Sequence, residues 1–337
     1  MKALTYTQAL VEALVEEMEA DPRVLYLGED IRHGGIFQGT KGLFERFGPE
    51  RVISTPICEA SFIGVGLGLA LTGFRPIIEV MWADFTTCAA DTIINSVAKM
   101  RFKTNGKVAV PMVIMTRQGG WIGHGASQSQ CVEALFGHFP GLDIVMPGTP
   151  SDAKGLMKTS IRTSNPVLFL QPKSEIYGTR EPETEQARAE HPLWARGGFK
   201  FPVASDLAAI PLGQADIKRP GDQITLVTWG SMLSRSLLAA DVLAQSGASV
   251  EVIDLRTLRP LDEEQIFASV RRTHRLVIAQ ERDDGRVNVG QAPLRRGSSA
   301  RLDHASSPRR ERSPAGLHHA VAGARQSGVD AEDDHGL

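Results

Sequence analysis

The chain has 337 residues, enough for two domains of ordinary size, and a formal net charge of -2 with both signs interspersed. This balance gives no electrostatic reason to expect a nucleic-acid partner. The longest apolar run, about 13 residues at 62–74, is too short to cross a bilayer, and the N-terminus lacks a signal-peptide core. Three cysteines without CxxC pairing indicate reduced thiols rather than a disulfide framework or a zinc site. We therefore expect a cytoplasmic protein without a membrane partner.

Helix and strand patterns alternate along the first half of the chain. Apolar residues at helical spacing predict a first helix that is capped by Thr5 or Thr7 and ends at Asp21. The further elements expected in order are a strand at 24–27, a helix at 40–47, a strand at 52–53, a buried apolar segment at 62–74, a strand at 75–80, a helix at 85–100, a strand at 110–115, a helix at 130–136, a strand at 142–146, a helix at 151–163 and a strand at 167–170. Such alternation predicts an α/β domain over residues 1–177, built on a parallel sheet with both faces covered.

The second half begins with a break in this rhythm. Residues 178–209 are charged, rich in Gly and Pro and without periodicity, which indicates an interdomain linker. Residues 210–281 then repeat the alternation, with strands at 224–228, 250–254 and 276–279 and helices at 231–246 and 262–272. Short connections in this order predict parallel strands with right-handed crossovers, and hence a second, truncated α/β domain.

The composition changes abruptly after Glu281. Residues 282–337 hold nine arginines but no Phe, Trp, Tyr, Ile, Met, Cys or Lys. So little apolar surface predicts a tail that is poorly packed or disordered. A basic interaction tail is one interpretation. We favour a shift of reading frame, because the change interrupts a domain in the middle of its sheet.

A single carboxylate, Glu59, stands just before the uncharged segment 62–74. We expect this segment to be buried and to take Glu59 into the interior with it. Burial of a carboxylate without a partner is costly and raises its pKa, which suits a general acid or base acting on a cofactor nitrogen. The alternative is a glutamate that interacts favourably with the dipole at a helix start. Spacing alone does not decide between the two.

Several motifs, in a fixed order from about Leu4 to Glu281, resemble those of a known family. The matching stretches are residues 27–30 (LGED), 55–59 (TPICE), 73–85 (GFRPIIEVMWADF), 91–99 (DTIINSVAK), 140–142 (PGL), 151–156 (SDAKGL), 227–232 (VTWGSM) and 252–262 (VIDLRTLRPLD). The chain resembles the beta subunit of the thiamine-diphosphate-dependent 2-oxo acid dehydrogenases, of pyruvate, branched-chain and acetoin dehydrogenase type. The resemblance implies a transketolase-like fold, with a pyrimidine-binding domain followed by a transketolase C-terminal-like domain.

The resemblance also assigns roles to residues around Glu59. In this family the equivalent glutamate hydrogen-bonds a ring nitrogen of the cofactor's aminopyrimidine and so promotes loss of the thiazolium proton. By position, Ile57, Met81 and Phe85 would line the pyrimidine pocket, with the Phe85 ring available for stacking. Without the resemblance, these three apolar residues would be read as ordinary core.

Half of a thiamine diphosphate site is missing from the sequence. The family holds the diphosphate through magnesium on a Gly-Asp-Gly motif with a later asparagine, and neither Gly221-Asp222 nor Asp284-Gly285 fits it. The resemblance therefore implies an alpha subunit that holds magnesium, in an alpha2-beta2 heterotetramer. Family members also bind a structural potassium ion through carbonyl oxygens. The corresponding positions here are Met112, Ser160, Ile161, Thr163 and Asn165, for which an ordinary helix end is the alternative.

One departure from the family lies in a glycine-rich stretch, residues 119–130. The family has His-Ser-Gln where this chain has Gln128-Ser129-Gln130. That histidine is implicated in acyl transfer to a lipoyl group, and glutamine cannot shuttle a proton near neutral pH. His124 would replace it only if the loop folds back, and a solvent-facing side chain is the alternative.

These features predict the beta subunit of a 2-oxo acid dehydrogenase, which decarboxylates pyruvate or a branched-chain 2-oxo acid and acylates the lipoyl group of an acyltransferase component. Gln128 alone supports an alternative, an acetoin dehydrogenase or a transketolase-like transfer to a non-lipoyl acceptor. The altered tail supports another, a subunit that cannot assemble. The sequence does not rank the 2-oxo acids.

Overall fold

The computed structural model describes residues 1–35, 39–120, 125, 127–174, 201–281 and 287–289, with no side-chain description for the last range. The chain divides into two units, residues 1–302 and 303–337, and the second unit lies wholly outside the described residues. In the described part, no helix is both long and apolar enough to cross a membrane.

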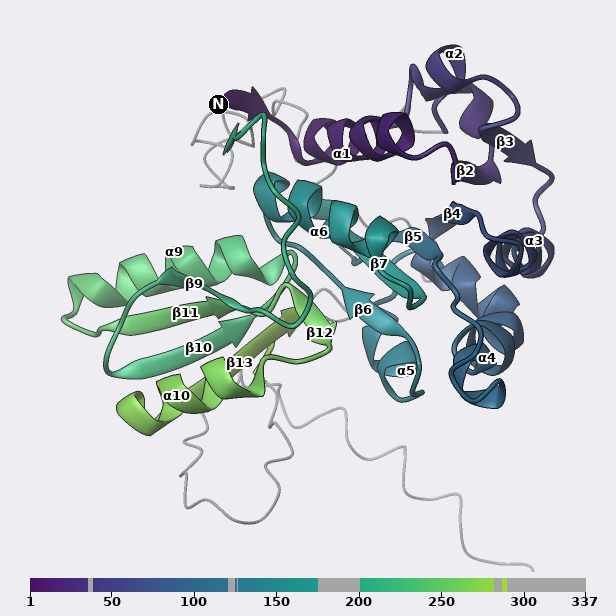
Figure 1. Ribbon diagram of the computed structural model, residues 1–337. Coiled ribbons are helices and arrows are strands. Elements are labelled where there is room, and N and C mark those ends of the chain that lie inside the picture. Colours follow the sequence, from purple (N-terminus) through teal and green to yellow (C-terminus); the bar gives the residue numbers. More distant parts are fainter. Residues whose placement is uncertain (36–38, 121–124, 126, 175–200, 282–286, 290–337) are drawn as a thin grey trace, which may run out of the picture. The chain divides into compact units, whose positions relative to one another are not determined.

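A seven-stranded sheet forms the centre of the first half (Figure 1). Its strand order is β12-β6-β7-β5-β4-β2-β3, and only β12 runs antiparallel to its neighbour. The strands are β2 (Val24–Glu29), β3 (Val52–Thr55), β4 (Arg75–Trp82), β5 (Val113–Gln118), β6 (Asp143–Val145), β7 (Val167–Pro172) and β12 (Thr257–Arg259). Strands β2, β5 and β7 are buried at every residue, as expected for a parallel sheet that is covered on both faces.

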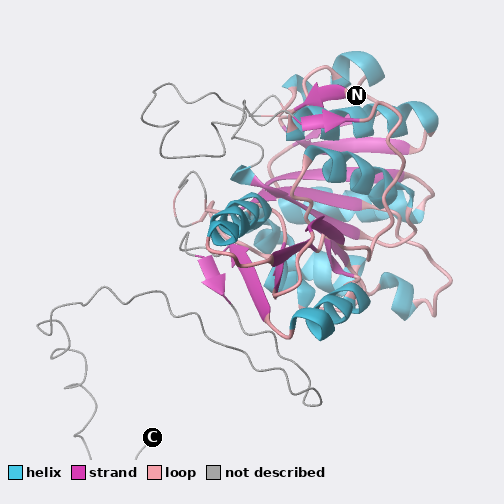
Figure 2. Ribbon diagram, turned by 90° about the vertical axis from the view of Figure 1, so that its left-hand side faces the viewer, coloured by secondary structure: helices cyan, strands magenta, loops and turns pink. Residues whose placement is uncertain are grey.

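Helices cover both faces of this sheet (Figure 2). One apolar core lies under α1 and α6, and the other lies under α3 and the irregular helices that follow β4. The helical elements of this half are α1 (Tyr6–Ala20), η1 (Ile31–His33), α2 (Leu43–Phe47), α3 (Glu59–Leu71), η2 (Ala83–Ala89), η3 (Thr92–Val97), α4 (Met100–Lys103), α5 (Glu133–Gly137) and α6 (Pro150–Arg162). The first helix begins where predicted, because Thr5 forms a capping box with Gln8.

A second sheet of five strands has the order β14-β13-β10-β11-β9. Its strands are β9 (Asp216–Arg219), β10 (Ile224–Thr228), β11 (Val250–Asp254), β13 (Leu276–Glu281) and β14 (Val287–Val289), and its helices are α9 (Met232–Gln245) and α10 (Glu263–Thr273). The three predicted strands, β10, β11 and β13, are parallel to one another, and β9 and β14 add antiparallel edges. The predicted fold class, two α/β domains with parallel sheets, is confirmed.

Two predictions from the first half are wrong in detail. The helix expected at 85–100 is divided into a 3-10 helix, a π-helix and the short α4. The hydroxyls of Thr86 and Thr87 donate to the carbonyls of Ala83 and Asp84, which competes with regular helix bonding at its start. The uncharged segment 62–74 is also not fully buried, since one side of α3 is open to solvent.

The predicted linker at 178–209 lies mostly outside the described residues. Its last part contains a strand that was not predicted, β8 (Phe201–Val203), which pairs antiparallel with β1 (Lys2–Leu4). The predicted tail, 282–337, is outside the described residues apart from β14, which pairs with β13. The domain boundaries and the nature of the tail therefore stay predictions.

Candidate active site

The carboxyl ends of five parallel strands bring chemically active side chains to one edge of the first sheet. β2 ends at Glu29, and β3 is followed by Glu59 in the first turn of α3. The ends of β4, β5 and β7 lead to Asp84, to the connection that carries Gln128, and to Lys173. This edge is where ligands bind in open α/β sheets.

Buried polar atoms without a hydrogen-bond partner gather at the same edge. Among the described residues they include both carboxylate oxygens of Glu29, Oγ1 of Thr55, Oδ2 of Asp84 and Oγ of Ser129. Most buried polar groups in a folded protein are paired, so each such atom calls for an explanation. Unpaired buried oxygens on four residues at or beyond neighbouring strand ends are consistent with a site that binds a polar ligand.

Glu29 and Glu59 are close enough for their charges to interact. Burial raises the pKa of Glu29, and the charges of Glu59, Asp30 and Glu79 raise it further. Glu59 is only half-buried, so the expectation that it enters the interior is wrong. The reason is that α3 begins at the sheet edge with its first turn open, and the deeply buried carboxylate of this pair is Glu29.

A group of polar side chains that pair with one another lies next to Glu29. Arg117 Nη1 is 2.6 Å from Glu79 Oε1, and the Tyr26 hydroxyl donates to Glu79 Oε2. Burial raises the pKa of Tyr26 well above its ordinary value, with a further rise from the Glu79 charge, so this phenol stays protonated. We interpret this group as a rigid support for the ends of β2, β4 and β5.

Gln128 is half-buried, and its backbone carbonyl accepts a hydrogen bond from Lys173. The Lys173 side chain is inaccessible to solvent, and its Nζ lies 4.1 Å from the centroid of the Trp82 ring, a cation–π contact. Burial lowers the pKa of Lys173, while the nearby Asp84 charge opposes that shift. The sequence analysis missed Lys173, whose only signal was a lysine directly after an uninterrupted buried strand.

The three apolar residues expected around a pyrimidine ring differ in exposure. Ile57 is 72% exposed, whereas Met81 and Phe85 are half-buried and Phe85 packs against the core under α3. Ile57 follows β3, Met81 lies near the end of β4 and Phe85 follows β4, all at the edge that holds Glu59. His124 lies outside the described residues.

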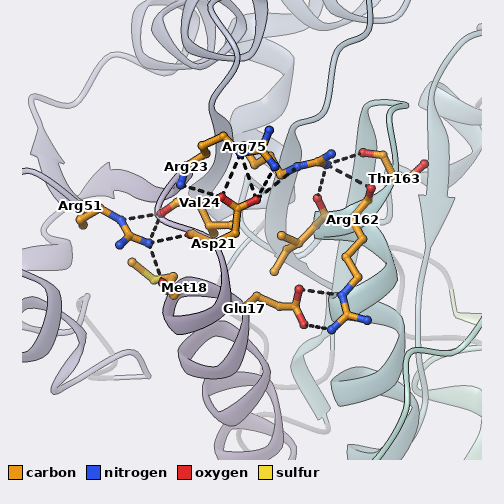
Figure 3. A network of polar contacts seen from close by, with 10 residues as sticks. Glu17, Met18, Asp21, Arg23, Val24, Arg51, Arg75, Arg162 and Thr163 are labelled. Atoms are coloured by element: carbon orange, nitrogen blue, oxygen red, sulfur yellow. Dashed lines mark hydrogen bonds and ion pairs between the residues drawn. The ribbon is translucent and has the colours of Figure 1, made fainter.

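The positions expected to bind potassium surround the C-terminal end of α6, where a guanidinium already lies (Figure 3). Arg75 Nη1 donates to the carbonyl oxygens of Ile161, Arg162 and Thr163 at 2.8, 3.1 and 3.0 Å. The Met112 carbonyl accepts from the Val167 amide, and the Asn165 side chain bonds Arg101 and Asp143. A helix C-terminus attracts cations, and each carbonyl oxygen keeps a second lone pair, so a potassium site here stays a prediction.

The described residues contain no group of three or more His, Cys, Asp or Glu side chains that could hold a metal ion.

Comparisons with known proteins agree with the two-domain organisation. Residues 2–178 match the family model "Transketolase, pyrimidine binding domain", and residues 213–291 match "Transketolase, C-terminal domain". The chain is 42% identical over 283 residues to the 2-oxoisovalerate dehydrogenase subunit beta of Bacillus subtilis, covering 83% of this chain and 80% of that protein. It belongs to the beta subunits of the thiamine-diphosphate-dependent 2-oxo acid dehydrogenases.

Other relatives extend this assignment. The beta subunit of the pyruvate dehydrogenase E1 component of Bacillus subtilis is 38% identical over 282 residues, covering 83% of this chain and 81% of that one. A solved structure, "Split gene transketolase, inactive beta4 tetramer", shares the fold with a TM-score of 0.65 and 23% identity, over 83% of this chain and 81% of its own. These relatives do not favour the alternative of an acetoin dehydrogenase or a transketolase-like transferase that was based on Gln128.

As a beta subunit, the chain combines predicted and unpredicted site residues. The predicted Glu59, Met81 and Phe85 lie on segments that meet at one sheet edge, with the exposed Ile57 at its rim. Glu29 and Asp84 were only parts of matching motifs in the sequence. Their unpaired buried oxygens are visible only in three dimensions.

Proposed function

We propose that this chain is the beta subunit of the decarboxylating component of a 2-oxo acid dehydrogenase complex, and that it forms the pyrimidine half of a shared thiamine diphosphate site. The single observation that carries the proposal is the meeting of Glu59 with buried, unpaired carboxylate oxygens at the carboxyl edge of the first sheet. Aminopyrimidine has ring nitrogens and an amino group, and these complement carboxylates that hold or accept protons.

The chemistry divides between the cofactor and this chain. Thiamine diphosphate, when bound, supplies the electron sink for decarboxylation of a 2-oxo acid. Glu59 would hold a proton against a ring nitrogen, and Phe85 and Met81 would fix the ring plane and exclude water. The raised pKa of Glu29 keeps a second carboxyl beside Glu59 closer to neutral, which limits like-charge repulsion there. Gln128, at the position of the family's histidine, would orient substrate through its amide.

A second chain completes the proposed site. We propose an alpha subunit that holds magnesium and the diphosphate, in an alpha2-beta2 heterotetramer that serves a lipoyl acyltransferase component. The supporting argument is the missing diphosphate motif together with the names of the relatives, which are subunits of multi-component enzymes. A cytoplasmic location is part of the same proposal.

The substrate class is a small 2-oxo acid. Relatives named for 2-oxoisovalerate and for pyruvate are about equally similar, at 42% and 38% identity, so the proposal stops at the class. Potassium at the end of α6 would be structural, and we expect its replacement by choline to lower the thermal midpoint of the folded chain without changing the substrate preference. An identical midpoint in both salts would remove potassium from the proposal.

The proposal is tested by co-expressing the full chain with an alpha subunit of the same family. We expect a complex that decarboxylates a 2-oxo acid only with thiamine diphosphate and magnesium, and that acylates a lipoyl domain. Turnover with an artificial electron acceptor but none with the lipoyl domain would instead favour a non-lipoyl acceptor. Failure to form any complex would favour the assembly-defective subunit. Binding of the whole cofactor and magnesium by the isolated chain would contradict the shared site.

A further inference from the structure

The connection between β5 and α5 carries Gln128, and the second sheet contacts it at its start. Glu281, the last residue of β13, accepts a hydrogen bond from the backbone amide of Gly120 at 2.9 Å. The other oxygen of the same carboxylate accepts from the hydroxyl of Ser231, which precedes α9. The Glu281 side chain is therefore fixed within its own domain while it bonds the backbone of the other one.

The approach is so close that only glycine fits at the preceding position. Gly119 has a φ of +104°, and a Cβ there would lie 2.8 Å from Glu281 Oε2 and 2.9 Å from Oε1. A side chain at this position would be strained by the backbone and would collide with the carboxylate. The carboxylate thus packs directly against the peptide at 119–120.

The second sheet also contacts the far end of the connection. Trp229, at the end of β10, donates a side-chain hydrogen bond to Glu133, the first residue of α5. Gln118 Nε2 donates to Glu133 Oε2 at 2.7 Å, and Gln118 Oε1 accepts from the Val132 amide at 3.1 Å. Both ends of the connection are therefore tied to the second sheet.

Hydrogen bonds link these ends to the middle of the connection. The Gly119 amide donates to the carbonyl of Gln130 at 3.3 Å, and the Gln130 amide donates to Asp84 Oδ1 at 3.2 Å. Two residues earlier, the Gln128 carbonyl is held by Lys173. A displacement at 119–120 would therefore shift Gln130, and with it the peptide that presents Gln128.

We infer that Glu281 is a positioning residue: its carboxylate, held by Ser231, fixes the backbone at Gly119–Gly120 and so places Gln128 and Gln130 against the ends of β4 and β7. The role of Gln128 in this inference rests on the proposed function, whereas the contact of Glu281 with Gly120 does not depend on that function. It gives the second domain a part in organising the active site that lies on the first.

The test uses the full chain in complex with its alpha subunit and two readouts. The first is backbone amide exchange at Gly120 and Gln130, measured by mass spectrometry on short overlapping peptides. The second is the rate of lipoyl acylation relative to the rate with an artificial electron acceptor. Purely structural damage would lower both rates together, whereas misplacement of the Gln128 segment lowers lipoyl acylation selectively.

Glu281→Ala is expected to speed exchange at both amides at least about tenfold and to lower lipoyl acylation by about 10–100-fold, with a KM for the 2-oxo acid that changes little. Glu281→Gln keeps one oxygen for the Gly120 amide and should restore both readouts to within about threefold. The matched control is Glu251→Ala, which removes another buried carboxylate of the second sheet, paired with Arg272 at 2.6 Å and without a hydrogen bond to the described residues of the connection. It should leave exchange at Gly120 unchanged.

Equal exchange at Gly120 in Glu281→Ala and in the unmodified chain overturns the inference, as does an equal effect of Glu251→Ala. If Glu281→Ala does not assemble, Ser231→Ala frees the carboxylate on its own side and should speed the same exchange, and unchanged exchange again overturns the inference. An unmodified complex without thiamine-dependent turnover would defeat the proposed function instead, while the exchange result still decides the role of Glu281.

Discussion

Helices α3 and α6 cover opposite faces of the first sheet, and their sequences give the wrong impression of their burial. α3 lies within a segment that has no charge from 62 to 74, yet Val65 is 56% exposed and Leu71 is 42% exposed. α6 contains two lysines and an aspartate, yet Lys154 is inaccessible to solvent and Asp152 and Lys158 are buried.

The difference lies in what packs on the outer side of each helix. α6 is covered by α1 and by the segment around Leu207 and Ile210. Carboxylates of α1 pair with its two lysines, and cations from the second half of the chain pair with its aspartate. Lys154 lies 2.9 Å from Glu12 and 2.8 Å from Glu16, and Asp152 lies 2.6 Å from Arg256. The described residues provide no such cover over Val65 and Leu71. Burial of a charge thus indicates a partner within the chain, whereas an exposed apolar helix indicates a surface that another chain can cover.

The largest expected effect is at the start of α3. Glu59→Gln keeps the size of the side chain but removes its ability to hold a proton against a cofactor nitrogen. We expect turnover of the complex to fall by about 10²–10⁴-fold with cofactor binding retained. Calorimetry with thiamine diphosphate and a decarboxylation assay measure the two effects. Glu50→Gln, at an exposed position before β3, is the control, and a Glu59→Gln complex with unchanged turnover would dismiss the assigned role.

In α6 we expect a large loss of stability when its buried cation is removed. Lys154→Ala leaves Glu12 and Glu16 without their shared partner and should lower the free energy of unfolding by about 3 kcal/mol. Lys2→Ala removes an exposed lysine that lies 2.9 Å from the same Glu12, and should cost less than about 1 kcal/mol. Chemical denaturation followed by circular dichroism compares the two variants. Equal losses of unfolding free energy would show that the buried lysine of α6 contributes no more to stability than the exposed Lys2.

The aspartate at the start of α6 is linked to a titration in the second sheet. Burial, together with the charge of Asp152, raises the pKa of Asp254 from its ordinary value of 3.8 to about 7. At a pH between these two pKa values the folded chain keeps a proton on Asp254 that the unfolded chain has released. Asp254 therefore lowers the free energy of unfolding progressively as the pH rises towards 7, and this loss of stability is constant above that pH. The difference in pKa corresponds to about 4 kcal/mol.

Asp254→Asn removes the free-energy cost of burying a charged carboxylate, but it also removes the attraction of Lys218 and Arg256. The net effect should be a stabilisation of the chain at pH 8 by about 2 kcal/mol. At pH 4.5 the variant and the unmodified chain should differ little. Denaturation midpoints at the two pH values measure this, with the half-exposed Asp216 changed to Asn as the control. A stabilisation that is the same at both pH values would contradict the assignment of the titration to Asp254.

The smallest effect on the folded chain is expected on the open side of α3. Val65→Asp should change the stability of the isolated chain by less than about 0.5 kcal/mol, because the side chain is already exposed. If a partner covers this face, the same change should weaken assembly with the alpha subunit at least about tenfold. Val242→Asp, on α9 and 65% exposed, is the matched control, and sedimentation of the mixed subunits gives the comparison. Equal assembly of both variants would mean that α3 is not a contact surface.

The sequence was sufficient for elements whose signals are local. Thr5 with Gln8 defines the start of α1, and the continuous apolar runs of β5 and β7 correctly indicated strands covered on both faces. The breaks after β4 were missed, because Thr86 and Thr87 bond backbone carbonyls in a way that helical spacing does not reveal. Short edge strands such as β1 and β8 depend on a partner some 200 residues away, as in the pairing of Ala3 with Pro202.

The candidate site was predictable only in part, for the same reason. Glu59 stood out through its contrast with the apolar run that follows it, and family resemblance supplied Met81 and Phe85. The burial of the Glu29 oxygens and the hydrogen bond from Lys173 to the Gln128 carbonyl depend on which strand ends become neighbours. Strand order, β7 beside β5 and β4 beside β2, is a property of the whole sheet.

Strand β12 comes from the second half of the chain but completes the first sheet, where Thr257 pairs with Val145. A fragment that stops after β7 would leave β6 as a bare edge, able to recruit strands from other molecules. Fusion proteins or truncations designed around a cut between the two halves should therefore aggregate, and gene-splitting experiments would do better to keep residues 257–259 with the N-terminal piece.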